Sequence, residues 1–281
     1  MPAIGWYNGT IGRPEEISVP INDRAVYFGD GVYEACLAIG TKPFGLVPHI
    51  DRFYRSLSLL SIPFDMSKEA LIKTLTDCLK AAGEQSAALY WQASRATAPR
   101  THAFPTNGAK PNLLITVTPK QAPNLKSPMR LILSDDVRYA MCHVKTLNLI
   151  PNVLASERAH ACGADEAVFV RDGFVTEGSH TNVHIVKDGT LFTHPTDQYI
   201  LPGVTRGYLL SIAKQAGIPV TERAFTVEEL KAADEILISS STLGVRRAIT
   251  LDGVPVGGRD ERTLETVWTA YERIFQEETG A

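Results

Sequence analysis

Residues 119–128, PKQAPNLKSP, divide the sequence into two parts with different patterns. The segment carries three prolines and few apolar residues, and each proline fixes its own backbone and restricts the residue before it. This composition is typical of a connection between elements. We therefore predict two domains, residues 1–118 and residues 129–281, joined by a linker at 119–128.

Both parts mix strand and helix signals. In the N-terminal part, Asn8-Gly9 predicts a hairpin, and residues 25–40, AVYFGDGVYEACLAIG, are rich in strand-forming residues. Helical spacing follows within residues 49–62, and a second helix is expected between Ser67 and Gly83. Further strands are predicted at 88–96 and 112–118.

The C-terminal part continues this alternation. We expect strands at 130–135, 166–170 and 235–240, hairpins at 183–192 and 250–256, and helices at 153–163, 205–217, 226–230 and 264–275. The whole chain is therefore predicted to be α+β, with two lobes of mostly antiparallel strands and helices.

Composition excludes several classes of partner. The net charge of −3 over 281 residues offers no basic surface for nucleic acid or an acidic membrane. The four cysteines lack C-x-x-C spacing, no apolar run could span a bilayer, and the amino terminus lacks a signal-peptide pattern. His180 and His184 are four residues apart but lie in a predicted strand without an adjacent glutamate, so we predict no metal site. These features indicate a soluble cytoplasmic protein.

One lysine stands in an apolar run. In residues 142–152, CHVKTLNLIPN, Lys145 lies close to Val144, Leu147 and Ile150. If this run is packed, burial would lower the pKa of the lysine, and an uncharged amine is a nucleophile toward aldehydes. The alternative is a solvated lysine at a strand edge.

Other polar residues follow in the sequence. Glu177 lies in a short polar segment between two apolar strands, within FVTEGSHTNV. In LPGVTRG, residues 201–207, Gly203 precedes a helix start that includes Thr205, which suits a phosphate, although an ordinary capped helix would look the same. Arg52 is placed on the exposed face of the first helix.

Taken together, KTLN, TEGSHTN, LPGVTR and the early HIDRFYRS resemble the fold-type IV pyridoxal-phosphate enzymes, and they occur in the right order. That family includes branched-chain and D-amino acid aminotransferases and aminodeoxychorismate lyase. The resemblance implies that Lys145 forms the Schiff base with pyridoxal 5'-phosphate and moves the substrate proton, and that Glu177 bonds the pyridine nitrogen. It also implies a set of cofactor-binding residues: Arg52, Val204, Thr205, Ser241 and Thr242 at the phosphate, and Arg138 with Glu166 as a polar pair nearby.

Residues 95–105, RATAPRTHAFP, resemble the D-amino acid aminotransferases. In those enzymes an Arg-x-His pair reaches into the partner's site and, with a tyrosine, grips the substrate carboxylate, which assigns that role here to Arg100, His102 and Tyr33. The resemblance implies a homodimer with shared sites and a ping-pong transfer from a D-amino acid such as D-alanine to a 2-oxo acid such as 2-oxoglutarate.

Three alternatives stay open. The first is a branched-chain or broad-specificity L-aminotransferase, the second is a lyase acting on aminodeoxychorismate, and the third is a non-catalytic binding protein. One departure from the D-specific pattern is that His180 and Thr181 stand where small serines are expected, so the preferred amino acid is open.

Overall fold

The computed structural model describes residues 3–106 and 108–281. Its contacts divide the chain into two compact units. The N-terminal unit contains the residues up to Ala122 together with Val144–Asn148 and Phe275–Ala281. The C-terminal unit contains Pro123–His143 and Leu149–Ile274.

This division differs from the predicted boundaries, which put Lys145 in the C-terminal domain. The segment Val144–Asn148 belongs to the N-terminal unit because it pairs with a strand there: Tyr33 N donates to Lys145 O (2.9 Å), and Leu147 N donates to Gly31 O (3.1 Å). Gly31 permits the approach, since a Cβ atom at this position would lie 2.8 Å from Leu147 Cδ1. The role of residues 119–128 as a linker stays a prediction.

The N-terminal unit is built on a six-stranded antiparallel sheet with the order β2-β1-β6-β5-β3-β4. The expected hairpin at Asn8-Gly9 is confirmed, because Tyr7 pairs with Thr10 across the turn. The strands are β1 (Ile4–Tyr7), β2 (Thr10–Gly12), β3 (Gly31–Ile39), β4 (Lys42–Pro43), β5 (Ser86–Ser94) and β6 (Asn112–Pro119).

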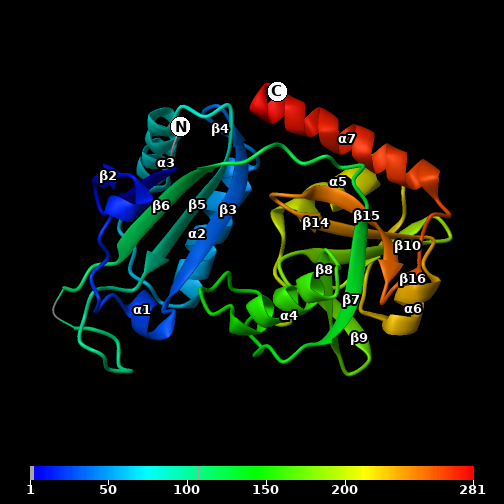
Figure 1. The fold of residues 1–281 in the computed structure, drawn as a ribbon, viewed down its shortest axis with the longest axis horizontal. Helices are drawn as coiled ribbons and strands as arrows, with labels where there is room; N and C mark the ends of the chain where they lie inside the picture. The colour runs from blue at the N-terminus through cyan, green and yellow to red at the C-terminus, as the bar shows by residue number, and fades with distance from the viewer. Residues whose placement is uncertain (1–2, 107) are drawn as a thin grey trace. The chain divides into compact units, whose positions relative to one another are not determined.

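Helices α2 (Leu46–Leu59) and α3 (Lys68–Ala82) pack on one face of this sheet (Figure 1). Their apolar stripes bury Phe53, Leu57, Leu75 and Leu79 against Trp91 and its neighbours in the strands. The cap predicted at Ser67 is confirmed, since its side chain accepts a hydrogen bond from Ala70 N. The opposite face of the sheet carries the row Tyr7, Leu114, Gln92 and Tyr33, which are cross-strand partners.

One predicted strand segment is wrong. Residues 25–28 belong to a short helix, α1 (Arg24–Phe28), and only the part from Gly31 onward forms a strand. The Asp23 side chain accepts a hydrogen bond from Ala25 N and so caps the helix, while Gly29 ends it in the left-handed region at φ 60°. Capping overrides the strand preference of Val26, Tyr27 and Phe28. A 3-10 turn, η1 (Pro14–Glu16), precedes it.

The C-terminal unit contains a ten-stranded mixed sheet with the path β12-β11-β10-β14-β15-β7-β8-β9-β13, and β16 pairs with β15. Gly178 N donates to Thr181 O (2.8 Å) where β9 turns into β10, so the sheet curls back on itself. Its strands are β7 (Met129–Asp135), β8 (Glu166–Arg171), β9 (Phe174–Gly178), β10 (Asn182–Lys187), β11 (Thr190–Thr193), β12 (Val220–Glu222), β13 (Phe225–Thr226), β14 (Glu235–Ser240), β15 (Gly244–Leu251) and β16 (Val254–Pro255).

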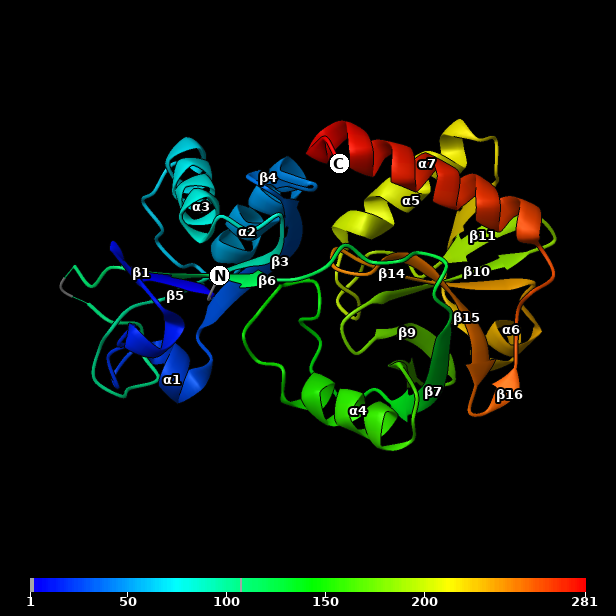
Figure 2. The same cartoon turned by 45° about the horizontal axis from the view of Figure 1, so that its top comes forward.

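Four helices accompany this sheet (Figure 2). They are α4 (Ile150–Ala161), α5 (Val204–Gln215), α6 (Val227–Ala232) and α7 (Glu261–Thr279), whose last turn from Phe275 groups with the N-terminal unit. The predicted capping box is confirmed, because Thr226 and Glu229 exchange hydrogen bonds at the start of α6. The α+β prediction is confirmed. Within the described residues, none of the helices has the length and apolar character needed to cross a membrane.

Candidate active site

Lys145 lies beside Tyr33 in the N-terminal unit. Its Nζ atom is 4.2 Å from the centroid of the Tyr33 ring, and Val32 and Thr146 form a bridge between β3 and the lysine segment. The run around Lys145 is less buried than its composition predicts: Val144 is buried, Lys145 and Leu147 are partly exposed, and Ile150 is exposed. Lys145 is therefore partly exposed, with its amine beside an aromatic ring.

Arg52 is buried rather than exposed, so its predicted place on the helix surface is wrong. Its Nε and Nη2 atoms donate to Glu34 Oε1 and Oε2, both at 2.7 Å, and His49 Nδ1 lies 2.6 Å from Glu34 Oε2. Burial alone would raise the pKa of Glu34, but the charge and hydrogen bonds of Arg52 lower this pKa to about 2. Burial lowers the pKa of His49, so the imidazole is neutral and donates its Nδ1 proton to the carboxylate.

Arg100 and His102 lie together on the exposed loop after β5. The Arg100 guanidinium is 5.2 Å from the centroid of the Phe28 ring, and the His102 ring is 5.4 Å from the same centroid. Among the described residues, Arg100 has no hydrogen-bonded partner, so its donors face solvent. The structure thus places Arg100 and His102 beside the same aromatic ring. Their closeness in the sequence makes this possible.

Glu177 lies near the end of β9 in the C-terminal unit and is buried among hydrogen-bond donors. Arg138 Nη1 donates to Oε1, while Asn182 Nδ2 (3.0 Å) and Leu201 N (2.9 Å) donate to Oε2. These donors hold the carboxylate in one orientation.

Arg138 is shared between two carboxylates. Its Nε and Nη2 atoms donate to Asp136 at 2.9 Å each, and its guanidinium lies 4.3 Å from the Phe169 ring centroid. Burial alone would raise the pKa of Asp136, but Arg138 lowers it below its ordinary value. Burial would lower the pKa of Arg138, and the two carboxylates raise it instead, so the guanidinium stays charged beside Glu177.

Glu166 forms a separate cluster. Its carboxylate accepts hydrogen bonds from the Ser179 hydroxyl and from Thr181 Oγ1 (2.9 Å), and His180 Nδ1 lies 3.1 Å away. Arg138 and Glu166, expected as a polar pair, therefore bond to different partners in the described structure. His180 is half exposed, and Glu166 holds its ring at the β9–β10 turn.

The start of α5 offers an anion site in the C-terminal unit. Gly203 is the N-cap residue and provides no side-chain cap, so the first turn of α5 lacks the usual capping oxygen. The side-chain oxygens of Thr205 and Ser240 are buried without a hydrogen-bond partner among the described residues. Ser241 and Thr242 follow directly, in the turn between β14 and β15. A phosphate bound at the start of α5 would offer acceptor oxygens to the Thr205 hydroxyl.

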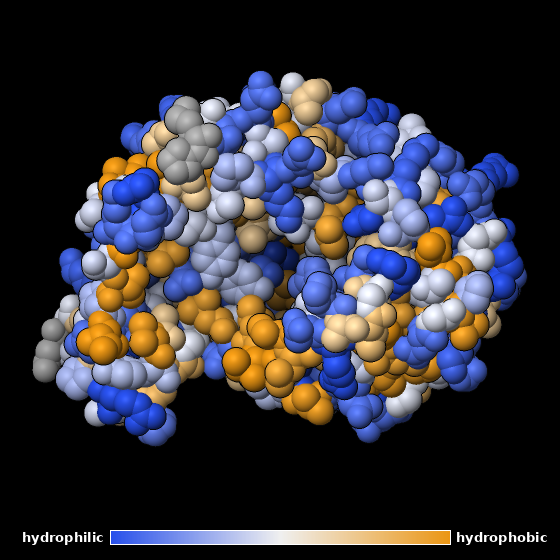
Figure 3. All heavy atoms as spheres, in the orientation of Figure 1, coloured by the Kyte–Doolittle hydropathy of each residue, from blue (hydrophilic) through white to orange (hydrophobic). Residues whose placement is uncertain are grey.

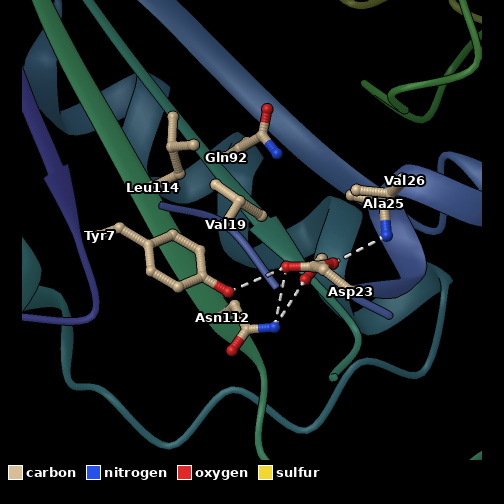
Figure 4. A pocket seen from close by; sticks show the side chains of 9 residues that line it. Tyr7, Val19, Asp23, Ala25, Val26, Gln92, Asn112 and Leu114 are labelled. Atoms are coloured by element: carbon tan, nitrogen blue, oxygen red, sulfur yellow. Dashed lines mark hydrogen bonds between the residues drawn. The ribbon is translucent and has the colours of Figure 1, made fainter. Parts of the chain in front are cut away.

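The N-terminal unit also contains a cavity of about 280 Å³ beside α1 (Figure 4). Asp23 lies at its wall and accepts hydrogen bonds from Tyr7 Oη (3.1 Å) and Asn112 Nδ2 (2.9 Å). Burial, followed by the charge of Asp23, raises the pKa of Tyr7 to about 12. No residue predicted from the sequence for the cofactor or substrate lines this cavity.

Several residues of these clusters were missed by sequence reasoning. Glu34, His49, Asp136 and Asn182 all contact predicted site residues. Helical spacing offers one signal, since His49 and Arg52 are three residues apart and share a face. Asp136 is two residues from Arg138, but short polar spacing of this kind is too common to single it out.

Comparisons with known proteins identify relatives over most of the chain. The model of the family described as amino-transferase class IV matches residues 31–250. The D-alanine aminotransferase of Staphylococcus haemolyticus is 38% identical over 254 residues, which is 90% of each chain. That of Bacillus licheniformis is 34% identical over 277 residues, which is 98% of each chain.

Among solved structures, the branched-chain amino acid aminotransferase from Escherichia coli superimposes with a TM-score of 0.89. It is 25% identical, and the match covers 99% of this chain and 96% of that one. Another branched-chain aminotransferase, solved with pyridoxamine 5'-phosphate, gives a TM-score of 0.88 at 25% identity. The predicted two-domain fold of type IV is thus confirmed by likeness of the whole chain. The family match covers most of the chain and both lobes of the fold, so this protein belongs to the class IV aminotransferases and uses pyridoxal phosphate as its cofactor.

Proposed function

We propose that the protein is a D-amino acid aminotransferase of the D-alanine type, with a 2-oxo acid such as 2-oxoglutarate as the amino-group acceptor. The observation that carries this proposal is the exposed Arg100-Thr101-His102 segment, whose guanidinium has no hydrogen-bonded partner in the described structure. Two curated relatives named D-alanine aminotransferase support it by their identity over nine-tenths or more of the chain.

In this proposal the cofactor is bound by residues that fit its chemistry. Thr205, Ser241, Thr242 and the Val204 amide receive the phosphate at the start of α5, where buried hydroxyls lack partners. Arg52 adds positive charge, and Glu34 holds its guanidinium in one orientation. Glu177 accepts a hydrogen bond from the pyridine N–H. Arg138 donates a hydrogen bond to the same carboxylate and so holds it in place.

Pyridoxal phosphate, when bound, supplies a ring that accepts the electron pair left when the substrate Cα loses its proton. Lys145 is the residue that moves this proton. Its Nζ atom takes the proton from Cα as an unprotonated amine and then returns it to the neighbouring reacting carbon. The Tyr33 ring, 4.2 Å away, limits where this amine can point.

The substrate carboxylate is held by Arg100, His102 and Tyr33. A guanidinium offers two parallel donors to a carboxylate, and an imidazole and a phenol can each add one. With the carboxylate fixed on one side, only one enantiomer presents its Cα proton to Lys145, and we assign this geometry to the D enantiomer.

We further propose a homodimer in which each subunit lends Arg100 and His102 to the site of its partner. An exposed apolar surface in the C-terminal unit supports self-association, because large apolar patches on soluble proteins usually mark interfaces. Figure 3 shows hydrophobic atoms gathered over α4. Three exposed residues on one face of α4 form this surface, which we call the α4 patch: Ile150, Val153 and Leu154.

The four cysteines are free thiols, two of them buried, which is typical of a reducing compartment. We therefore propose that the enzyme works in the cytoplasm.

The main alternative is a branched-chain or broad-specificity L-aminotransferase, which the structural likeness at 25% identity also allows. Absorbance spectra of the purified holoenzyme separate the two. We expect the cofactor band to change on addition of D-alanine and to stay constant with L-alanine or L-leucine. A response to the L amino acids alone would assign the enzyme to the alternative, and pyruvate release from aminodeoxychorismate without an oxo acid would indicate the lyase.

A further inference from the structure

We propose that Arg24 and Phe28, both in the short helix α1, are positioning residues that hold the loop bearing Arg100 and His102 in its substrate-binding shape. This inference rests on the proposed role of Arg100 in gripping the substrate carboxylate. It extends that role to two residues that touch neither the cofactor nor the substrate in the proposal above.

The Phe28 ring contacts two residues of the loop. The guanidinium carbon of Arg100 lies 5.2 Å from its centroid, and the His102 ring lies 5.4 Å away with an interplanar angle of 42°. A cation near an aromatic face is attracted by the ring quadrupole. One side chain therefore contacts both of the residues that are proposed to bind the carboxylate.

Arg24 fastens the backbone of the same loop. Its Nη1 atom donates to Thr101 O (2.7 Å) and more weakly to Ala103 O (3.4 Å), the carbonyls on either side of His102. Its guanidinium carbon is also 4.8 Å from the Phe28 centroid. Arg24 is buried, so these bonds form in a setting from which water is largely excluded.

Asp30 fixes Arg24 in turn. Its carboxylate accepts hydrogen bonds from Arg24 Nε (2.7 Å) and from Arg95 Nε (2.9 Å). Burial alone would raise the pKa of Asp30, but Arg95 and Arg24 lower it, so the carboxylate remains charged. Arg95 also lies 3.7 Å from the centroid of Phe104, which secures the far side of the loop.

Helix α1 is itself tied to the sheet. Arg24 N donates to Ala96 O (3.0 Å), and the cap residue Asp23 bonds Tyr7 and Asn112 at the cavity shown in Figure 4. The exposed loop is thus linked to the rigid strands through α1. A group held in its binding geometry before the ligand arrives costs less to order on binding.

The test uses the holoenzyme with D-alanine and compares KM with kcat. We expect Phe28→Leu to raise KM for D-alanine roughly fivefold, with a smaller change in kcat, because the ring that orders Arg100 and His102 is lost. Phe28→Tyr keeps the ring and should restore KM. Val26→Ala is the control, since Val26 is in the same helix, is 58% exposed and carries no ring.

A double-mutant cycle shows whether Phe28 acts through Arg100. If it does, Phe28→Leu adds little to KM in an Arg100→Ala background. An equal increase in both backgrounds, or no increase in the wild-type background, would overturn the inference. If Arg100→Ala alone leaves KM unchanged, Arg100 does not bind the substrate carboxylate. In that case the proposed function of Arg100 fails, and this result differs from one in which Arg100 matters but Phe28 does not. Arg24→Lys keeps the positive charge but loses the planar guanidinium group. We expect it to raise KM for D-alanine as well.

Discussion

Arg52 donates two parallel hydrogen bonds to Glu34, both 2.7 Å long, and both side chains are buried in the N-terminal unit. The pair joins α2 to β3 and determines where the guanidinium of a proposed phosphate-binding residue can point. A buried arginine held by a carboxylate is costly to separate, because either charge left alone in the interior is poorly solvated.

This pair predicts a stability effect. Glu34→Gln should lower the free energy of unfolding at pH 7 by roughly 3 kcal/mol, since Arg52 then loses its charged partner. Denaturant titration of wild type and variant measures the difference. Glu15→Gln, at an exposed glutamate of the same unit, is the control and should change little.

The pH dependence of this difference follows from the lowered pKa of Glu34. That pKa is about 2 in the folded protein against 4.5 for the free side chain, so the stabilisation is present above pH 4.5 and is lost as the pH falls toward 2. At pH 3.5 the gap between wild type and Glu34→Gln should be narrower by roughly 1 kcal/mol than at pH 7. A gap that stays constant over this range would show that folding does not lower the pKa of Glu34.

Glu177→Gln should impair catalysis more than folding. The variant keeps a side chain of the same size but removes the negative charge proposed to face the pyridine nitrogen, and we expect kcat/KM to fall by roughly 100-fold or more. Glu228→Gln, at an exposed glutamate of the same unit, should behave like wild type. Unchanged kinetics in Glu177→Gln would remove this residue from the cofactor site.

Shared sites can be tested by mixing two inactive subunits. Lys145→Ala lacks the proton-transferring amine, and Arg100→Ala lacks the carboxylate-binding guanidinium. In a purified hybrid of the two, one of the two sites regains both groups if Arg100 serves the partner, so we expect about half of the wild-type activity per dimer. A hybrid as inactive as its parents would mean that Arg100 serves its own subunit.

The α4 patch predicts where the subunits meet. Leu154→Asp places a charge on an exposed helix position, with 61% of the residue accessible, and we expect sedimentation velocity to show monomers. Val254→Asp is a matched control, because Val254 is equally exposed (63%) but lies on β16, away from the α4 sequence. Dimers that persist in Leu154→Asp would place the interface elsewhere.

Local signals predicted most of the elements. Asn8-Gly9 specified its hairpin, Ser67 its helix cap, and Thr226 with Glu229 a capping box, because each depends on residues only a few positions apart. The segment Arg24–Phe28 was misassigned because its strand-forming residues compete with a cap at Asp23 that closes onto Tyr7 and Asn112. Those partners are distant in sequence.

The amino-acid sequence was enough to identify the family and most of the elements, and it predicts the chemical groups of the site: one lysine in KTLN, one glutamate in TEGSHTN and the Arg-x-His loop. Tertiary contacts were needed to show that Lys145 pairs with β3, that Arg52 is buried against Glu34, and that Arg24 of α1 holds the Arg100 loop. The last two of these contacts join residues 18 and 77 positions apart. Periodicity and composition describe only near neighbours, whereas burial and charge pairing arise when distant segments exclude water together.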